Sequence, residues 1–522
     1  MNTSAKHLGG LALLAPMALS SVTAKQKQPN IIFFLVDDYG WADSQVQYGQ
    51  DLYPRNNMFH TPNMLRLAQK GVVMTNAYAC SLSTPTRTSL MSGLNSAHLR
   101  ITTFTSPKKD TPTDASGGTI GVINENESDP LARGDWNWNG ISTRPGVNNT
   151  MYITPFVQHL KNAGYFTIHV GKAHWGTYGT PGCSPYNMGF IVNVAGSCNG
   201  FPRSYLGKEN YGNNSDMWTF NAVQSLAEYY GTDTHLTEAL TLEAKKALEY
   251  PISKGQPFYL YMSHYGVHTP ITRDDRFIQR YLDMGLDEGA ARYSSMVEGV
   301  DKSLGDLMDF LDEKGIADNT IIIFMSDNGG HSANTVKGGT AHTQNAPLRE
   351  GKASVYEGGI RVPEMFYWPG KTQAGQRIDT PTMPEDMYPT IMEMAGIKNY
   401  TTVQDMDGQS LVSLITKNTG VSPDRELVFH MPHQWRIEDQ DDIDFMTAMR
   451  KGEWKLVYRM HTGALELYNI KNDLSEMHNV ADQHPQLVKD MAKALGNRLR
   501  SWRANMPIVR ATGKPVAMPD EL

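Results

Sequence analysis

Two acidic pairs follow two of the most apolar runs in the chain. Asp37 and Asp38 come directly after residues 29–36, and Asp327 and Asn328 come just after residues 320–325. Carboxylate and amide oxygens, with no Cys or His among them, suit a hard cation, Ca²⁺ or Mg²⁺. Because ionised carboxylates at buried strand ends are unfavourable without a neutralising charge, we expect these side chains to hold such a cation. The alternative is that some of them only cap turns.

Several basic side chains lie in motifs near the ends of other predicted strands or in turns. They are Arg87, Lys172, His174, His268 and Lys352. A divalent cation with several basic side chains forms a pocket for a compact tetrahedral oxyanion. This set therefore indicates sulfate or phosphate ester chemistry, with charge stabilisation as the main catalytic contribution. Taken singly, each of these residues is more often a surface charge or, for histidine, a capping or core residue.

The stretch Ser83-Thr84-Pro85-Thr86-Arg87 is predicted to be a strand-to-helix turn. It would direct a serine and an arginine toward the positive end of a helix, which is how anion sites are built. In isolation the same pattern is an ordinary turn with a surface arginine. The interpretation as an anion site therefore depends on the acidic pairs and the basic side chains named above.

The elements that must position these residues alternate along the chain. Continuous apolar runs at 31–36, 165–170, 257–262 and 320–325 are typical of buried parallel strands, and helical patterns cover 61–68, 236–248 and 291–314. This alternation predicts an α/β fold, a large, mostly parallel central sheet sandwiched by helices, with one site at the carboxyl ends of the strands.

The pattern changes near the C-terminus. Short β-prone segments at 427–429, 445–449, 454–458 and 465–468 predict an antiparallel sheet, and a helix is expected over 486–502. We therefore expect a signal peptide at 1–24, a catalytic domain at 25–420 and a smaller α+β domain at 421–522.

Composition narrows the partners. The chain has 522 residues and a net charge of −7, which favours neither nucleic acid nor an anionic membrane surface. Lys6 and His7 precede an apolar run at 8–20, and Val22 and Ala24 fit a cleavage site. The run is too short to span a bilayer, so we expect an exported, periplasmic or secreted protein, a monomer or weak oligomer without a membrane span.

Three cysteines are too few for a disulfide scaffold. Cys183 and Cys198 are either paired or two free thiols, and the sequence leaves both open. Cys80 is interpreted as a buried structural residue and not as a nucleophile.

Six motifs in order resemble those of the formylglycine-dependent type I sulfatases of the alkaline phosphatase superfamily, and among them bacterial carbohydrate sulfatases. The motifs are Asp37-Asp38-Tyr39-Gly40, Ser83-x-Pro85-x-Arg87 with Ser92-Gly93, Gly171-Lys172-x-His174-x-Gly176, His268-Thr269-Pro270, Ser326-Asp327-Asn328-Gly329 and the stretch from Lys352 to Pro363. They cover most of the chain beyond residue 25, and together they are far more specific than any one alone.

The resemblance implies a role for each residue. Ser83 would be oxidised to formylglycine by a maturation enzyme, and the hydrate would be the nucleophile. His174 would act as the base and His268 as the general acid for the leaving alcohol. The Ca²⁺ ligands would be Asp37, Asp38, Asp327, Asn328 and the group derived from Ser83, while Arg87, Lys172 and Lys352 would bind and position the sulfate and the formylglycine.

One departure concerns the nucleophile position. Many members of the family carry Cys where this chain has Ser83. A Ser form requires a different maturation route, typical of anaerobic bacteria in the family, and the other explanation is an inactivating Cys→Ser change. The sequence is compatible with both.

The resemblance also implies a sulfated glycan as substrate, attacked by an exo-acting enzyme on a galactose- or hexosamine-type sugar. Two alternatives stay open at this point, a phosphoesterase on the same scaffold and a non-catalytic glycan-binding protein with unmodified Ser83. Aromatic and forked polar side chains suit sugar binding, and the candidate sugar contacts are Arg100, Trp175, His430, His433, Trp435 and Arg436.

Overall fold

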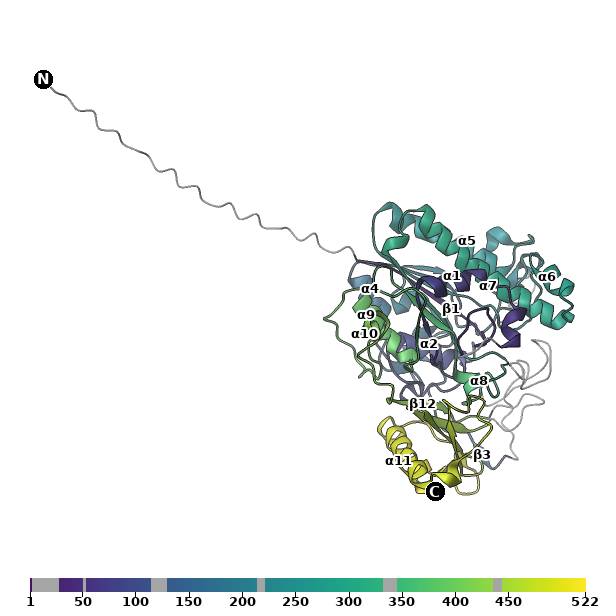
Figure 1. Ribbon diagram of the computed structural model, residues 1–522, viewed down its shortest axis with the longest axis vertical. Helices are drawn as coiled ribbons and strands as arrows, with labels where there is room; N and C mark the ends of the chain where they lie inside the picture. Colours follow the sequence, from purple (N-terminus) through teal and green to yellow (C-terminus); the bar gives the residue numbers. More distant parts are fainter. Residues whose placement is uncertain (2–27, 50–52, 114–128, 214–220, 332–344, 435–443) are drawn as a thin grey trace.

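The computed structural model describes residue 1 and residues 28–49, 53–113, 129–213, 221–331, 345–434 and 444–522 (Figure 1). A large part contains an eight-stranded sheet in the order β11-β2-β10-β9-β1-β8-β6-β7. The strands are β1 (Asn30–Val36), β2 (Val72–Met74), β6 (Phe166–Gly171), β7 (Val192–Val194), β8 (Phe258–Ser263), β9 (Thr320–Ser326), β10 (Glu364–Tyr367) and β11 (Gln376–Ile378).

The centre of this sheet is parallel. β1 pairs in parallel with β8 on one side and with β9 on the other, and β6 pairs in parallel with β8. In this register Leu35 lies opposite Ser263 and Val36 opposite Ser326, so the strands end at nearly the same level. The residues that follow them therefore meet at one edge of the sheet, as the sequence predicts.

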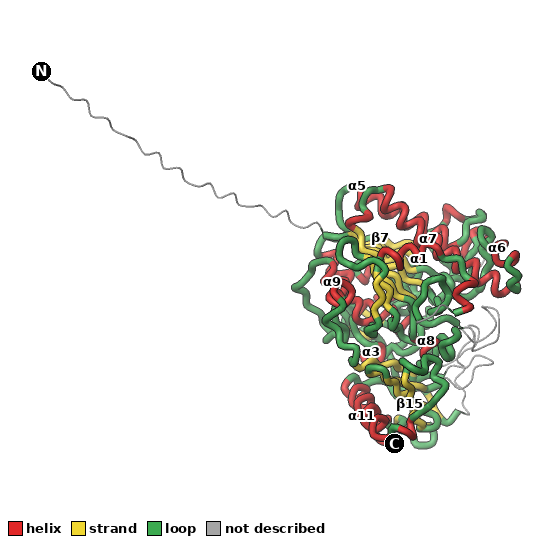
Figure 2. Tube along the Cα trace, viewed as in Figure 1, coloured by secondary structure: helices red, strands yellow, loops and turns green. Residues whose placement is uncertain are grey.

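Both faces of the sheet are covered by helices (Figure 2). Alternate residues of β1 point to opposite sides, so Ile32 and Phe34 pack in one apolar cluster while Ile31 and Phe33 pack in the other. The first cluster includes α1 (Pro62–Lys70), α5 (Leu236–Ser253) and α7 (Glu288–Glu313); the second includes α2 (Ser83–Ser92), α4 (Phe156–Asn162), α9 (Met387–Met394) and α10 (Val412–Lys417).

A smaller part with an antiparallel sheet lies below the large one (Figure 1). Helix α11 (Pro485–Ser501) covers one side of this sheet, and the other side packs on Tyr78, Leu82 and Val355 of the large part. The strands are β12 (Glu426–Met431), β13 (Met446–Lys451), β14 (Trp454–Arg459) and β15 (Ala464–Asn469). The predicted fold class is therefore confirmed.

Short elements complete the described chain. β3 (Leu131–Ala132), β16 (Ile508–Val509) and β17 (Lys514–Pro515) form a three-stranded sheet, and β4 (Ile141–Ser142) pairs with β5 (Met151–Tyr152). The remaining α-helices are α3 (Ser96–Leu99), α6 (Ile278–Asp283) and α8 (Glu357–Ile360). Among the helices of the described ranges, none is both long and apolar enough to cross a membrane.

Some details differ from the sequence prediction. The stretch from Ser83 to Arg87, predicted as a strand-to-helix turn, already belongs to helix α2, and β10 runs antiparallel to β9 and β2. Cys80 is buried, which raises the pKa of its thiol to about 12, as a structural cysteine requires. Cys183 and Cys198 carry free thiols. Nearly all of the predicted signal peptide lies outside the described residues, and the domain boundary near residue 420 stays a prediction.

Candidate active site

The two acidic pairs meet where β1 and β9 end. The backbone nitrogen of Asp327 donates to the carbonyl oxygen of Val36 at 3.0 Å, which continues the pairing of the two strands. The backbone nitrogen of Asp38 donates to Oδ1 of Asp327 at 3.2 Å, and Nδ2 of Asn328 donates to Oδ1 of Asp38 at 2.8 Å. All four of these site residues are buried, so their polar atoms must be satisfied by one another or by a ligand.

Ser83 opens helix α2 and reaches this cluster. Its Oγ lies 3.1 Å from Oδ1 of Asp37 and 3.2 Å from Oδ1 of Asn328, and it accepts a hydrogen bond from Nζ of Lys172 at 3.1 Å. The side chain at position 83 therefore touches both acidic pairs and one lysine. It is 4% exposed, so the group at this position is almost fully enclosed by the protein.

Three cationic side chains neutralise the three carboxylates. Nε and Nη2 of Arg87 lie 2.8 Å from Oδ2 of Asp327. Nζ of Lys172 lies 2.6 Å from Oδ2 of Asp37, and Nζ of Lys352 lies 2.7 Å from Oδ1 of Asp38. With one cation for each carboxylate, the formal charge of the six side chains is zero.

The two predicted catalytic histidines flank this cluster. Nε2 of His268 lies 3.6 Å from Oδ2 of Asp38, and its Nδ1 lies 3.0 Å from the carbonyl oxygen of Thr269. Nε2 of His174 lies 3.1 Å from the carbonyl oxygen of Thr105, and its ring nitrogens lie 3.2 Å from Oγ1 of Thr84, the neighbour of Ser83.

Burial and neighbouring charges shift the protonation of the site. Burial, with the charge of Asp327 beside it, raises the pKa of Asp37 despite its contact with Lys172. Burial opposes ionisation of Asp38 as well, but the charge of Lys352, the hydrogen bond from Asn328 and the other positive neighbours together outweigh it and hold the pKa of that carboxyl below its usual range. Burial and the positive charge of Lys352 lower the pKa of His268 to about 3. Burial and the charge of Lys172 lower the pKa of His174, so both imidazoles are neutral at neutral pH.

The donor set fits a hard divalent cation. Ligand atoms of Asp37, Asp38 and His268 lie within 4.8 Å of one another, and Oδ1 of Asn328 faces the same Ser83 hydroxyl as Asp37. Carboxylate and amide oxygens dominate this set, as such ions prefer. Because the six charged side chains already sum to zero, a dication and a dianion can enter together without leaving a net buried charge.

The predicted sugar contacts are mostly core residues. Trp175 is fully buried and stacks on Phe190 with ring centroids 6.0 Å apart, which does not fit the predicted sugar contact. His433 is buried, with Nε2 2.7 Å from Oγ1 of Thr102, and His430 is buried as well. Trp175 fills an apolar cluster of the large part, and the two histidines are enclosed in contacts with Asn505 and Thr102, so the predicted sugar contact is wrong for these three buried rings.

Arg100 differs from those rings because it is half-buried. It ends helix α3, and its Nη2 donates to the carbonyl oxygen of Asp135 at 2.7 Å. Trp435 and Arg436 lie outside the described residues.

The structure also adds residues that the sequence did not single out. The ring of Phe201 stacks on His268, and Oη of Tyr205 donates to the backbone carbonyl of the same histidine at 2.8 Å. Both residues lie in an irregular region without periodicity, so the sequence pattern does not predict their contacts with His268.

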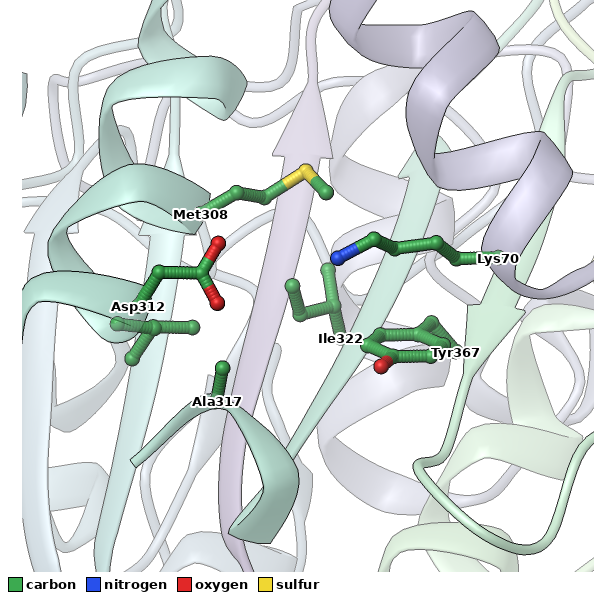
Figure 3. A pocket seen from close by; sticks show the side chains of 7 residues that line it. Lys70, Met308, Asp312, Ala317, Ile322 and Tyr367 are labelled. Atoms are coloured by element: carbon green, nitrogen blue, oxygen red, sulfur yellow. The ribbon is translucent and has the colours of Figure 1, made fainter. Parts of the chain in front are cut away.

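A small pocket lies elsewhere, where β9 begins (Figure 3). Lys70, Met308, Asp312 and Tyr367 surround Ile322 there. It sits near the amino end of a strand whose carboxyl end carries the acidic cluster, so it is separate from the site described above.

A parallel sheet with acidic oxygens at its carboxyl edge, a serine at a helix start and three cations defines a class of enzyme that cleaves esters of tetrahedral oxyanions. Residues 29–397 match the family model described as Sulfatase, and residues 351–505 match the one described as N-sulphoglucosamine sulphohydrolase, C-terminal. The chain belongs to the sulfatase family, and the predicted resemblance is confirmed. Its activity is that of a sulfuric ester hydrolase.

Several relatives are similar over nearly their whole length. A sulfatase of Formosa agariphila is 29% identical, with 94% of this chain and 92% of that protein covered. The N-acetylgalactosamine-6-O-sulfatase of Bacteroides thetaiotaomicron is 26% identical, with 90% and 93% covered. The solved structure of Ps i-CgsB in complex with k-i-k-neocarrahexaose has a TM-score of 0.68 and 27% identity, with 90% and 93% covered.

Proposed function

We propose that this enzyme hydrolyses a sulfate ester on a carbohydrate at the site around Ser83. The observation that carries the proposal is the position of the Ser83 side chain, which touches Asp37, Asn328 and Lys172 at once. A group at this position faces ligands for a cation on one side and a cationic side chain on the other. That is the arrangement needed to bring a nucleophile and a sulfate group together.

Two groups complete the proposed site. Ser83 is converted to formylglycine by a maturation enzyme, and the hydrated form supplies the nucleophile that attacks sulfur. Asp37, Asp38, Asp327, Asn328 and the group at position 83 would hold Ca²⁺, which supplies positive charge against the sulfate oxygens.

The other side chains bind the anion and position it. Lys172 contacts both position 83 and Asp37, so it orients the group at 83 while it attracts a sulfate oxygen. Arg87 donates to Asp327 and to the Lys172 carbonyl oxygen, so it holds a metal ligand and the lysine backbone in place. Lys352 is the third cation, and its amino group is free to shift from Asp38 toward an incoming anion when a metal ion neutralises that carboxylate.

The histidines move the protons in the proposed reaction. His268 donates a proton to the leaving sugar oxygen, which is a poor leaving group without one. A bound sulfate favours the protonated imidazole because opposite charges attract, and it thereby offsets the effect of Lys352. His174 is neutral and lies beside Thr84, next to position 83, where it acts as a base on the group at that position.

The carbohydrate part of the proposal is supported by relatives. The protein of Bacteroides thetaiotaomicron is named for N-acetylgalactosamine-6-O-sulfate hydrolysis, and Ps i-CgsB was crystallised with k-i-k-neocarrahexaose. We infer an exo-acting enzyme for this chain, with a galactose- or hexosamine-type sugar at the site. Arg100 is the described candidate that retains an exposed surface for such a sugar.

The first experiment measures the modification and the reaction. Mass spectrometry of the Ser83 peptide from the native host should show a mass lower by two hydrogens, as oxidation of the hydroxyl requires. The matured enzyme should release sulfate from at least one member of a panel of regiospecifically sulfated monosaccharides and release no phosphate from the matching phosphates. The variant Ser83→Ala is the inactive control. An unshifted peptide together with full activity would refute the formylglycine mechanism, and phosphate release alone would refute the sulfatase assignment to this site.

We also propose export, with removal of residues 1–24, and a monomeric or weakly associating mature enzyme. The apolar run at 8–20 and the small residues at 22 and 24 support cleavage. Sequencing of the mature N-terminus from the periplasmic or culture fraction should start near Lys25. Recovery of the protein with Met1 in the cytoplasmic fraction only would contradict export.

A further inference from the structure

One segment contacts both histidines of the site, and we name residues 197–205 the histidine strap. The carbonyl oxygen of Ser197 accepts a hydrogen bond from the backbone nitrogen of His174 at 3.0 Å. At the other end, Oη of Tyr205 donates to the backbone carbonyl oxygen of His268 at 2.8 Å. Tyr205 is fully buried, so this end of the strap is fixed in the protein interior.

Between those ends the strap lies against the imidazole of His174. A Cβ atom built on Gly200 would be 2.8 Å from Cε1 and 3.0 Å from Nε2 of that ring. The ring is also contacted by Oγ1 of Thr84 and by the carbonyl oxygen of Thr105. Position 200 therefore leaves no space for a methyl group without moving the histidine.

The next residue, Phe201, lies on the imidazole of His268. The two ring planes are within 3° of parallel and their centroids are 5.6 Å apart. Thr269 faces Nδ1 of the imidazole and Asp38 faces Nε2, so contacts in the ring plane are already defined. Phe201 limits the remaining freedom, which is tilting of the ring out of that plane. Phe201 itself is half-buried, so part of the residue is accessible to solvent.

We propose that Phe201 is a positioning and specificity residue, which holds His268 at the leaving-group side and forms an apolar wall for the sugar that leaves. The proposal rests on the proposed function, in which His268 donates the proton to the leaving oxygen. The C–H face of a pyranose ring packs on an aromatic face such as that of Phe201.

The dependence on leaving group tests this role. A sugar alkoxide needs the proton of His268, whereas the phenolate of nitrophenyl sulfate leaves without one. Phe201→Leu keeps most of the apolar volume but removes the flat face. We expect it to lower kcat/KM for the sugar sulfate about 10- to 100-fold, and to change that for nitrophenyl sulfate by less than about threefold. Phe201→Tyr keeps the ring and should retain near-normal values for both substrates.

The variant Gly200→Ala serves as the comparison, because a methyl group at position 200 would displace His174 and not His268. Because His174 works on the group at position 83 and not on the leaving oxygen, this variant should slow both substrates by similar factors. Equal losses on both substrates in Phe201→Leu, with an unchanged melting temperature, would refute the positioning role. A lower melting temperature with equal losses would assign Phe201 to folding and refute it too. Wild-type enzyme that releases sulfate from neither substrate would instead refute the proposed function.

Discussion

Lys455 is the buried charge on which the contact between the two parts of the molecule depends. It lies in β14 of the small sheet with its side chain fully buried, and its Nζ is 3.0 Å from Oε1 of Glu357 and 2.8 Å from Oε1 of Glu476. Glu357 opens helix α8 in the large part, five residues after Lys352. The lysine therefore neutralises two buried carboxylates from opposite sides of the interface.

Removal of this lysine leaves those carboxylates short of positive charge. Burial opposes ionisation of Glu357, but Lys455 and Arg361 lower its pKa below the usual value, whereas burial raises the pKa of Glu476 despite the lysine. Loss of one partner from a buried ion pair costs about 3–5 kcal/mol, because the remaining charge is uncompensated. Lys455→Met keeps the apolar part of the side chain and removes only the charge. We therefore expect the free energy of unfolding to fall by this amount, with no added loss from packing.

A second substitution separates charge from packing. In Lys455→Met with Glu476→Gln, only Glu357 remains charged, and it keeps its ion pair with Nη1 of Arg361 at 3.1 Å. We expect the double variant to recover about 2 kcal/mol relative to Lys455→Met alone, since one uncompensated carboxylate is gone.

Urea unfolding followed by tryptophan fluorescence measures these differences. The matched control is Lys246→Met, which removes an exposed lysine that contacts Glu228 and Glu243 and should cost less than about 1 kcal/mol. If the free energy of unfolding of Lys455→Met lies within about 1 kcal/mol of the wild type, or if the double variant is less stable than the single one, the interface does not depend on the charge of Lys455.

Three further predictions concern the site and the core. Chelation should lower the melting temperature, and added Ca²⁺ should restore it better than added Mg²⁺. At a hundredfold excess of Ca²⁺ over its Kd, the free energy of unfolding should rise by about 2.7 kcal/mol relative to the metal-free protein. Asp327→Asn should lose this response, and a wild type insensitive to chelator would contradict the cation site. Burial raises the pKa of Glu364 from 4.5 to about 8, so its contribution to stability is complete below pH 4.5 and is lost as the pH rises through 8, at up to about 1.4 kcal/mol per pH unit. Glu364→Gln should flatten the unfolding free energy over that range, whereas exposed Glu393→Gln should not. Arg87→Lys should lower kcat/KM at least about 100-fold, because a lysine cannot reproduce the forked contact with the carboxylate of Asp327; near-normal sulfate release would show that this contact is dispensable.

The strand ends were predictable because their signal is local. A run such as residues 31–36 of β1 is apolar throughout, which only a strand covered on both faces tolerates. Once several such strands are parallel, their carboxyl ends share one edge, and Asp37, Asp327 and Lys172 must come together there. The position of Ser83 followed in the same way, although its helix begins earlier than the pattern indicated.

The residues that were missed or misassigned depend on contacts between distant segments. Trp175 has an aromatic side chain of the kind that stacks on sugars, but Phe190 and Tyr261 pack against it in the core. Neither contact can be inferred from the neighbouring sequence. Phe201 is an ordinary aromatic residue in an irregular stretch until the fold brings His268 against it. The antiparallel direction of β10 likewise follows from its place between β9 and β2 and not from its four residues.

The one-to-one balance of charges around Ser83 would make the proposed cation and a sulfate dianion bind cooperatively. A dication alone, or a dianion alone, would leave a net charge in a buried region, whereas the pair leaves none. Each ligand therefore strengthens the binding of the other by the same factor, as thermodynamic reciprocity requires. Inorganic sulfate, the product, would then hold the metal ion in place, so the enzyme would be most resistant to chelators while it is inhibited by its own product.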